Sequence, residues 1–336
     1  MPGSYIWKKT FLFGVFGRLK KKYMMKKTGK LKNIIVPADY DYVGIYLTDK
    51  CFLRCPYCLT NHHGADFIGR KTADYLSSEE WIRALNRLVL PENVPITLQG
   101  GEPFLYPGIW EILDKITHKV DIMTALPPFL KKKDFLKLKK LDWNKRQAPY
   151  PSIRVSYHKG QNDFKELVDR IAELDDLLSI GLYYLNHPEI SEAEIRAMKD
   201  YAKEKAVEFR AKEFLGVHRG KTYGTIKYPD AVAGKVQGRA VHCKNTVVPV
   251  APNGEIYLCH SDLYFNRRDR SLGNILDDAF TFPDAHLLCL SFGLCSECDV
   301  KIKTNHYQEY GYTSVNIRFP QQETLISSAA DKKEQK

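Results

Sequence analysis

The feature that most constrains the fold is a regular alternation of short apolar runs with segments that have a helical pattern. The apolar runs are five or six residues long, as is typical of buried strands, and they occupy residues 43–48, 95–99, 120–124, 153–157, 180–185 and 207–212. Amphipathic helical segments lie at residues 77–88, 109–116, 131–141, 163–174 and 192–204. Ser77, three residues before Glu80, has the capping-box spacing of a helix start. Strands that alternate with helices form βα units, so the sequence predicts an α/β protein with a parallel sheet.

The eight cysteines fall into two groups, and the first group follows the first predicted strand. Cys51, Cys55 and Cys58 lie in the loop after residues 43–48, and 184 residues without cysteine separate them from Cys243, Cys259, Cys289, Cys295 and Cys298. Disulfide frameworks belong to small secreted domains, whereas intracellular cysteine clusters more often bind metal. The two groups therefore predict two metal centres.

Polar residues that follow the other strands are expected at the same edge of the sheet as the first cysteine group. In parallel sheets, ligands gather at the carboxyl ends of the strands. The residues at these ends are Gly100, Gly101, Glu102, Ser156, His158, Asn186, Lys212 and Glu213. For each of the last five taken alone, a role in supporting the fold is favoured over chemistry, and their shared position at strand ends strengthens the alternative that they contact SAM or substrate.

The segments Cys51-Phe52-Leu53-Arg54-Cys55-Pro56-Tyr57-Cys58 and Gly100-Gly101-Glu102-Pro103 resemble the radical S-adenosylmethionine (SAM) superfamily. The resemblance covers about residues 36–215 and extends through the later cysteines to about residue 305. It implies a partial (βα)6 barrel, similar to a TIM barrel, with a small C-terminal Fe–S domain. It also implies that three thiolates hold a [4Fe–4S] cluster whose fourth iron binds SAM, and that an electron from the cluster cleaves SAM to a 5′-deoxyadenosyl radical.

The same resemblance assigns roles to five residues that bind the cofactor. Tyr57 matches the aromatic position beside adenine, and Gly100 and Gly101 allow close approach of the backbone. Glu102 resembles the residue that receives the methionine ammonium group. Ser156 matches a polar residue near the ribose.

The second cysteine group resembles the twitch or SPASM extensions of this superfamily. Residues 247–259 predict a hairpin that turns at Asn253-Gly254 as a type I′ turn, and Cys259 follows Gly254 at the spacing of such extensions. A full SPASM extension has seven cysteines and two clusters, so five cysteines match the shorter form with one auxiliary [4Fe–4S] cluster. The expected ligands are Cys243, Cys259, Cys295 and Cys298, with Cys289 spare or as the alternate and with His260 and Asp299 beside them.

Zinc is the alternative at both cysteine groups. Cys51, Cys55 and Cys58 with His62 or His63 make a tetrahedral zinc donor set. That site would be structural, with no open position for a reaction, and it leaves Gly100–Pro103 unexplained. A structural zinc is likewise the alternative at the second group.

The net charge of +11 is concentrated at the N-terminus. Residues 1–33 contain ten Lys and Arg and no Asp or Glu, so the other 303 residues carry a net charge of +1. Aromatic and aliphatic residues alternate with these cations, which predicts an amphipathic helix that lies on an anionic membrane. The same segment is also compatible with an acidic peptide, with a phosphate backbone, or with a solvated leader that packs a few aromatic side chains.

The predicted organisation is a basic leader at 1–35, a radical SAM core at 36–230, an auxiliary-cluster domain at 231–310 and a C-terminal tail at 311–336. No apolar run approaches eighteen residues and the start lacks the layout of a signal peptide. The sequence therefore predicts a cytoplasmic protein, with peripheral contact at the inner membrane face as a further option.

The function expected from the resemblance is hydrogen-atom abstraction from a peptide or protein, with an electron donor such as a flavodoxin or ferredoxin. The alternative within enzymes is oxidation or epimerisation of a small molecule such as a sugar, polyol or lipid head group. Cys289 would then be the spare thiol that quenches a substrate radical. An alternative from another class is a zinc-stapled protein that binds nucleic acid through residues 1–33, which the nearly neutral charge of the remaining chain disfavours.

Overall fold

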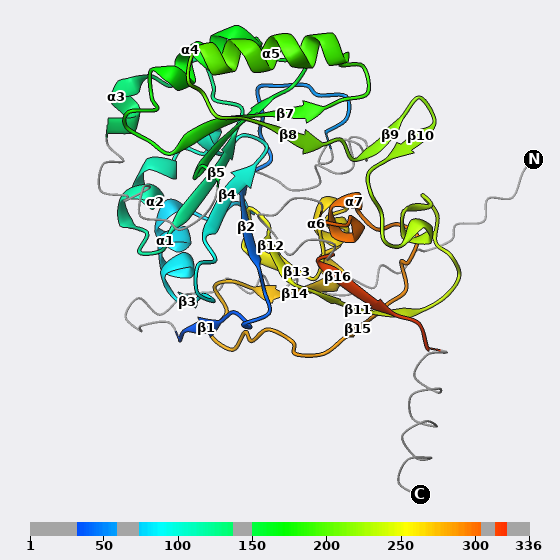
Figure 1. Cartoon of the computed structure of the whole chain (residues 1–336). Coiled ribbons are helices and arrows are strands. Elements are labelled where there is room, and N and C mark those ends of the chain that lie inside the picture. Colours follow the sequence, from blue (N-terminus) through cyan, green and yellow to red (C-terminus); the bar gives the residue numbers. More distant parts are fainter. Residues whose placement is uncertain (1–31, 59–73, 137–149, 304–312, 321–336) are drawn as a thin grey trace, which may run out of the picture. The chain divides into compact units, whose positions relative to one another are not determined.

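The computed structural model describes residues 32–58, 74–136, 150–303 and 313–320, and the chain from Lys32 onward forms one compact unit. Its centre is a sheet of nine strands in the order β14-β13-β12-β2-β4-β5-β6-β7-β8 (Figure 1). Seven neighbouring strands of this sheet, β12, β2 and β4 to β8, pair in parallel, so the predicted parallel sheet is confirmed. The leader at residues 1–31 lies outside the described residues.

The six predicted strands are all present within one or two residues of their expected bounds. They are β2 (Tyr42–Thr48), β4 (Ile96–Gly100), β5 (Val120–Thr124), β6 (Ile153–Tyr157), β7 (Ile180–Asn186) and β8 (Phe209–Glu213). The helices that connect them are α1 (Ser78–Asn86), α2 (Ile109–Lys115), α3 (Lys132–Phe135), α4 (Phe164–Ala172) and α5 (Glu192–Glu204). The capping box at Ser77 is confirmed, because its side chain accepts from the backbone of Glu80. Residues 137–141 of the third predicted helix lie outside the described residues.

Successive side chains of the parallel strands β2 and β4 to β8 point alternately to an apolar outer face and to a more polar inner face. Val155 and Leu182 are fully buried, in one apolar cluster with Val168 and Ile171 of α4. Side chains on a strand alternate between its two faces, so the residues between these positions point to the other, concave side of the sheet. The concave side carries polar groups from five strands: Tyr42, Thr97, Gln99, Asp121, Arg154, Ser156 and Tyr183. Figure 1 shows α4 and α5 covering β7 and β8 from outside.

The hairpin predicted after Cys243 is confirmed, but its predicted turn type is wrong. The hairpin consists of β12 (Val247–Val250) and β13 (Glu255–Tyr257), which pair at Val250 and Ile256. A type I′ turn needs a positive φ at both central residues, whereas within this loop only Gly254 has one, at 80°. The loop starts with a turn in which Gly254 N–H donates to the Ala251 carbonyl at 2.8 Å. Pro252 favours that geometry because its ring fixes φ near −65°.

A strand lies within the predicted C-terminal tail. β16 (Val315–Arg318) pairs antiparallel with β11 (Val241–Asn245), which also pairs with β15 (Leu287–Cys289). The prediction of a tail over 311–336 is therefore wrong for these residues. Val315 and Ile317 are buried and their neighbours are exposed, so the segment has the alternation of a half-buried strand.

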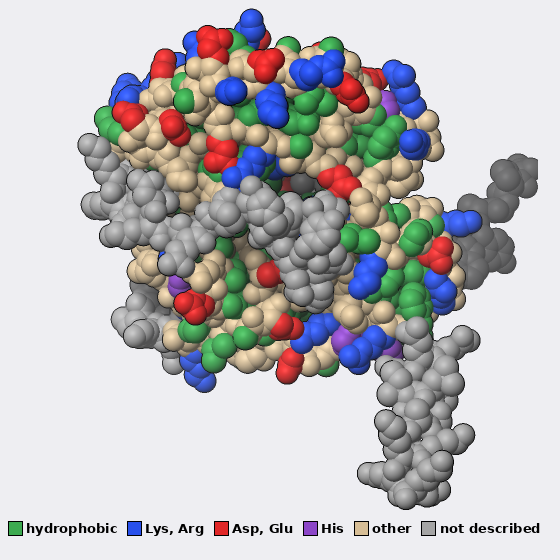
Figure 2. Space-filling model, in the orientation of Figure 1, with side chains coloured by type: hydrophobic (Ala, Val, Ile, Leu, Met, Phe, Trp, Pro, Cys, Tyr) green, Lys and Arg blue, Asp and Glu red, His purple; other side chains and the backbone are tan. Residues whose placement is uncertain are grey.

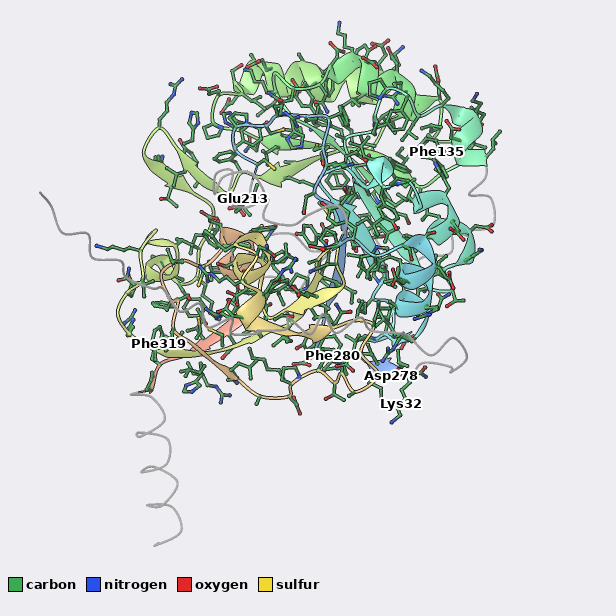
Figure 3. The ribbon with its side chains drawn as sticks, turned by 180° about the vertical axis from the view of Figure 1, so that it is seen from behind. Lys32, Phe135, Glu213, Asp278, Phe280 and Phe319 are labelled. Carbon is green, nitrogen blue, oxygen red and sulfur yellow. The ribbon has the colours of Figure 1, made fainter. Side chains whose placement is uncertain are left out.

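The predicted boundary at residue 230 separates segments that share one sheet. β12 pairs in parallel with β2, and β13 pairs with β14 (Ser271–Asn274), so the C-terminal part extends the barrel sheet. The remaining short elements of the described chain are β1 (Ile34–Ile35), β3 (Leu88–Val89), β9 (Gly216–His218), β10 (Lys221–Tyr223), α6 (His260–Tyr264), α7 (Glu297–Val300) and the 3-10 turns η3 (Pro103–Leu105), η6 (Pro229–Val232) and η7 (Arg268–Arg270). Lys32 N–H donates to Asp278 at 3.2 Å, and Figure 3 shows the two residues side by side.

The surface of the described part is mixed in charge. Figure 2 shows acidic and basic side chains interspersed over the helices at the top of the view, as the nearly neutral charge of residues 34–336 predicts. None of the helices in the described ranges is both long and apolar enough to cross a membrane.

Candidate functional site

The first cysteine group lies in the loop that follows β2, at the carboxyl end of the parallel strands. Arg54 holds the loop in shape, because its Nη1 donates to the Cys51 carbonyl at 3.1 Å and its N–H donates to Gln161 Oε1 at 2.9 Å. The three thiols are neighbours: burial, and then the charges of Cys58 and Cys51, raise the pKa of Cys55 to about 12. The structure thus brings together the three predicted ligands.

Gly100 and Gly101 pack the end of β4 against the base of this loop. A Cβ at Gly101 would lie 2.2 Å from the Lys50 carbonyl oxygen, and one at Gly100 would lie 2.3 Å from that of Thr48. Gly101 N–H donates to the Thr48 carbonyl and Glu102 N–H to that of Lys50, each at 2.7 Å. The close approach that these glycines allow is therefore to the stem of the cysteine loop, and their predicted approach to SAM stays a prediction.

Glu102 is the buried carboxylate of the site, with 1% of its surface exposed. Its Oε1 accepts from Phe104 N–H at 3.2 Å and from Thr124 Oγ1 at 2.8 Å, and its Oε2 accepts from Ala125 N–H at 2.8 Å. Burial raises its pKa to about 7, and these three hydrogen bonds oppose the rise. The carboxylate also contributes to the raised pKa of Cys51, so the two groups are close. A carboxylate has about four acceptor positions, which leaves one for a ligand such as an ammonium group.

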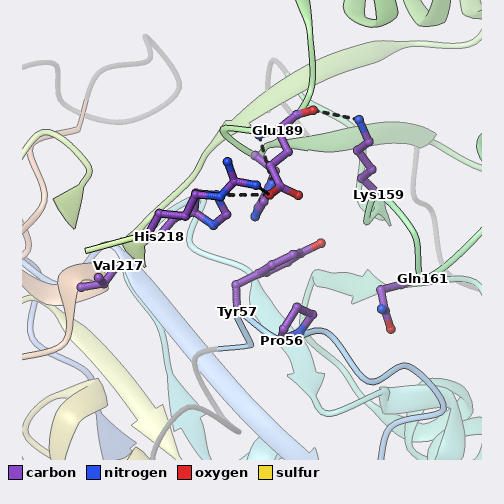
Figure 4. Close-up of a pocket in the computed structure, with 9 residues that line it drawn as sticks. Pro56, Tyr57, Lys159, Gln161, Glu189, Val217 and His218 are labelled. Atoms are coloured by element: carbon purple, nitrogen blue, oxygen red, sulfur yellow. Dashed lines mark hydrogen bonds and ion pairs between the residues drawn. The ribbon is translucent and has the colours of Figure 1, made fainter. Parts of the chain in front are cut away.

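Tyr57 forms one wall of a pocket beside the cysteine loop (Figure 4). Its ring centroid lies 4.9 Å from that of His187 and 5.8 Å from that of Phe214, and its hydroxyl lies 3.4 Å from His158 Nδ1. The pocket has a volume of about 370 Å³ and is lined by Pro56, Tyr57, Lys159, Gln161, His187, Glu189, Val217, His218 and Arg219. Burial, and then the charge of Lys212, lowers the pKa of His158 to about 4, so this imidazole is neutral near pH 7.

Ser156 lies on the concave face, where Lys212 Nζ donates to its Oγ at 3.2 Å. Of the other predicted strand-end residues, Asn186 is exposed, and Glu213 accepts from the backbone and hydroxyl of Thr225 at 2.7 and 3.0 Å. Figure 3 shows Glu213 where the chain leaves β8 toward the β9–β10 hairpin.

Arg154 and Asp121 also belong to the concave face, and sequence reasoning missed them. Arg154 Nη2 lies 3.2 Å from Asp121 Oδ2, and the Asp121 side chain is fully buried. Both residues lie inside strands, away from the strand ends that the prediction considered. A charged residue inside an otherwise apolar run was the available signal, because burying a charge is costly unless it is paired.

The second cysteine group is assembled from four separate elements. Cys243 on β11 and Cys289 on β15 are diagonal neighbours on paired strands, and Cys259 precedes α6. Cys243 hydrogen-bonds to Cys289, and this bond is the main reason that the pKa of Cys243 is raised and that of Cys289 lowered. Cys295 and Cys259 also contribute to the raised pKa of Cys243, so these four thiols are near one another. Arg270 Nη2 donates to Cys289 Sγ at 3.5 Å. Cys289, which was expected to be spare or the alternate ligand, lies inside the group.

Cys298 and its neighbours connect the second group to the concave face. The charge of Cys298 raises the pKa of Tyr46 and of Tyr264, although burial is the larger cause for both. The hydroxyl groups of these two tyrosines are 3.0 Å apart. His260 Nδ1 lies 2.8 Å from Asp299 Oδ1, so these two residues pair beside the cysteines.

The donor sets fit iron–sulfur clusters. All eight cysteines are free thiols, and burial raises the pKa of Cys51, Cys55, Cys259, Cys295 and Cys298. Thiols that are hard to ionise in the apo protein become thiolates when a metal centre supplies positive charge. Over the ranges that the structure describes, no three or more His, Cys, Asp or Glu side chains form a single metal-ion site, and His62 and His63 of the zinc alternative lie outside those ranges.

Comparison with curated proteins finds similarity to GTP 3′,8-cyclases. The enzyme of Hydrogenovibrio crunogenus is 28% identical over 185 residues, which cover 53% of this chain and 55% of that enzyme. The enzyme of Staphylococcus epidermidis is 26% identical over 236 residues, or 65% and 67% of the two chains. The chain thus spans about half the length of the first of these relatives.

Among solved structures, Streptococcus suis SuiB bound to S-adenosylmethionine matches with a TM-score of 0.39 and 18% identity, over 71% of this chain and 64% of SuiB. The family model of the radical SAM superfamily matches residues 45–208, which begin inside β2 and contain the cysteine loop, Gly100–Glu102 and β4 to β7. Members of this superfamily use a [4Fe–4S] cluster and SAM. The resemblance predicted from the cysteine spacing is confirmed, because residues 45–208 match the radical SAM superfamily.

Proposed function

We propose that this chain is an enzyme that reductively cleaves SAM and abstracts a hydrogen atom from an unreactive C–H bond of its substrate. The observation that carries the proposal is the junction between the cysteine loop and the end of β4. Two backbone hydrogen bonds of 2.7 Å join the loop to Gly101 and Glu102, so the three thiols and the buried carboxylate occupy one strand edge. A structural zinc site would not require this junction.

The residues at this edge have distinct proposed tasks. Cys51, Cys55 and Cys58 hold the cluster, and the acceptor position left on Glu102 receives the methionine ammonium group. Tyr57 provides an aromatic surface for adenine. When bound, the cluster and SAM supply the 5′-deoxyadenosyl radical that abstracts hydrogen. An electron donor such as a flavodoxin or ferredoxin reduces the site.

The second cysteine group is proposed to hold one auxiliary [4Fe–4S] cluster. Cys243, Cys259 and Cys295 are three ligands, and Cys298 or Cys289 is the fourth. Four thiolates leave no open iron, so this site accepts or relays an electron, or stabilises the C-terminal part. The Tyr46 and Tyr264 pair supports a connection to the concave face, because the two hydroxyl groups are 3.0 Å apart.

Two substrate classes are proposed. A peptide or protein is the first, because extensions with auxiliary clusters are frequent among peptide-modifying members of the superfamily. A small polar molecule is the second, and a specific observation favours it: the concave face is lined by charged and hydrogen-bonding side chains such as Arg154, Asp121 and Lys212. The curated relatives described above are likewise named for a reaction of GTP.

The test is iron and sulfide content of the anaerobically reconstituted chain, compared with a Cys51/Cys55/Cys58→Ala triple variant. We expect about eight irons per chain to fall to about four in the variant, with broad absorption in the visible range for both. With dithionite and SAM, the wild type is expected to form 5′-deoxyadenosine and the triple variant none. Bound zinc instead of iron, or equal 5′-deoxyadenosine from both proteins, would contradict the proposal.

A further inference from the structure

Three cationic side chains from separate parts of the chain meet at the concave side of the sheet. Arg154 lies on β6, Lys212 lies near the end of β8, and Lys301 follows α7 in the C-terminal part. Arg154 and Lys301 are the charged groups that act most strongly on the Lys212 ammonium. We call these three residues the cationic cluster.

The strand register explains why the cluster faces inward. Ser156 is paired with Tyr183, and Tyr183 is paired with Arg210, so these residues share the face opposite to the helices. Lys212 lies two residues after Arg210 and therefore on the same face. Its Nζ lies 3.2 Å from Ser156 Oγ and 5.4 Å from the centroid of the Tyr183 ring.

Negative charge on this face balances only part of the cluster. Asp121 binds Arg154, whose other side-chain hydrogen bond is to the Thr97 hydroxyl at 3.5 Å. Arg154 Nε is buried and has no hydrogen-bond partner among the residues that the structure describes. In the described part of the chain, no ion pair joins Lys212 or Lys301 to a carboxylate. Two of the three positive charges therefore lack a counter-charge among the described residues.

Cations gathered in a partly buried space are unfavourable unless an anion joins them. The effect on Lys212 is large: burial, followed by the charges of Arg154 and Lys301, lowers its pKa to about 7. A bound anion would restore the ammonium form and would offer Arg154 Nε the acceptor that it lacks. Lysine provides a point charge and arginine a directional donor, which together suit a multi-oxygen anion.

We propose that the cationic cluster binds an anionic group of the substrate, a carboxylate or a phosphate, on the concave face. This inference rests on the proposed function, because it assigns that face to the substrate. Both anions present several oxygen acceptors at hydrogen-bond distance, and the test separates them by using one probe of each kind.

The experiment uses the full reconstituted chain and measures dissociation constants for inorganic phosphate and for succinate from the shift of the unfolding temperature with probe concentration. The variants are Lys212→Met, Lys212→Arg and the matched control Lys199→Met, which removes an exposed lysine of α5. For at least one probe we expect the dissociation constant to rise about tenfold or more in Lys212→Met, because a hydrogen bond to a charged group is lost. Lys212→Arg should restore most of the affinity, and Lys199→Met should leave it unchanged.

Two results would overturn the proposal. Equal dissociation constants in wild type, Lys212→Met and Lys199→Met would show that the anions bind elsewhere or not at all. A rise of tenfold or more in the probe's dissociation constant with saturating SAM would assign the cluster to the SAM carboxylate. Iron content and 5′-deoxyadenosine formation are measured on the same wild-type preparation. If iron and 5′-deoxyadenosine formation are both absent, the proposed function is contradicted, and the dissociation constants of the two anions can still be interpreted.

Discussion

At the scale of single residues, the lowered pKa of Lys212 leads to a prediction about folding stability. This prediction can be tested without a bound ligand. Its pKa in the folded chain is lowered to about 7, mainly by burial and then by Arg154 and Lys301, whereas an unfolded lysine has a pKa of about 10.4. Between these values the unfolded chain binds more protons than the folded chain. The contribution of Lys212 to the free energy of unfolding therefore rises as the pH rises from 7 toward 10.

The measurement is urea unfolding of the apo chain at pH 7, 8 and 9. We expect Lys212→Met to show a smaller increase in stability with pH than Lys199→Met, which removes a lysine that is exposed on α5. Since both variants lose one lysine, their unfolded chains are matched in charge and titration, and they differ in whether the folded chain keeps Lys212. If the free energy of unfolding depends on pH equally in the two variants, the lowered pKa of Lys212 is contradicted.

The position of Cys289 leads to a second prediction at the scale of single residues. The sequence left this cysteine spare or as the alternate ligand. In the structure its thiol hydrogen-bonds to Cys243, whereas Cys298 lies near Tyr46 and Tyr264. We therefore expect Cys289→Ser to remove about four irons per chain and Cys298→Ser to retain them. Iron analysis with the visible spectrum measures this. The reverse pattern would return Cys298 to the ligand set.

Residues whose role follows from sequence position were predictable, and those whose role depends on closure of the sheet were not. The cysteine loop and Glu102 follow strands directly, so counting along the chain places them at one edge. Arg154 and Asp121 meet only because β5 and β6 are paired with their polar sides facing the concave space. The local sequence does not show which face of a strand will lie on the concave side of the sheet.

At the scale of elements, the junction between β4 and the cysteine loop gives a third prediction. In Gly101→Ala the new Cβ would clash with the Lys50 carbonyl, which belongs to the backbone and cannot turn away. We expect this variant to lose most iron from the first site and to unfold about 1–3 kcal/mol more easily, as overpacked variants do. Gly160→Ala is the control for iron binding, because a Cβ there meets nothing within 4 Å, although its φ of 75° means that alanine also lowers stability there. Normal iron binding by Gly101→Ala would show that the junction does not position the cysteines.

The elements that could be read from sequence are those with long, regular patterns. The helices α1 and α5 have capping boxes and apolar stripes, so their local sequence agrees with the final structure. β16 has only four residues and pairs with β11, which lies far away in the sequence. A strand that short becomes recognisable only through its partner, which explains the incorrect prediction of a tail.

At the scale of the whole molecule, charge is divided between two units of very different kind. The unit from Lys32 onward is compact, and residues 34–336 carry a net charge of only +1. Residues 1–33 carry ten positive charges and no negative charge, and aromatic residues lie between them. A cation near an anionic membrane surface contributes about 1 kcal/mol, so this segment alone would be sufficient for attachment.

The prediction is that the full chain sediments with vesicles that contain anionic lipid, whereas a chain that lacks residues 1–31 stays in the supernatant. The shortened chain keeps every residue of the compact unit, which begins at Lys32, so we expect it to retain its fold. Vesicles of neutral lipid are the control, and raised salt should release the full chain because screening weakens the attraction. Equal sedimentation of both chains would place any membrane contact on the compact unit. If the full chain does not bind the vesicles, the result would favour the alternatives in which the leader binds an acidic peptide or remains solvated.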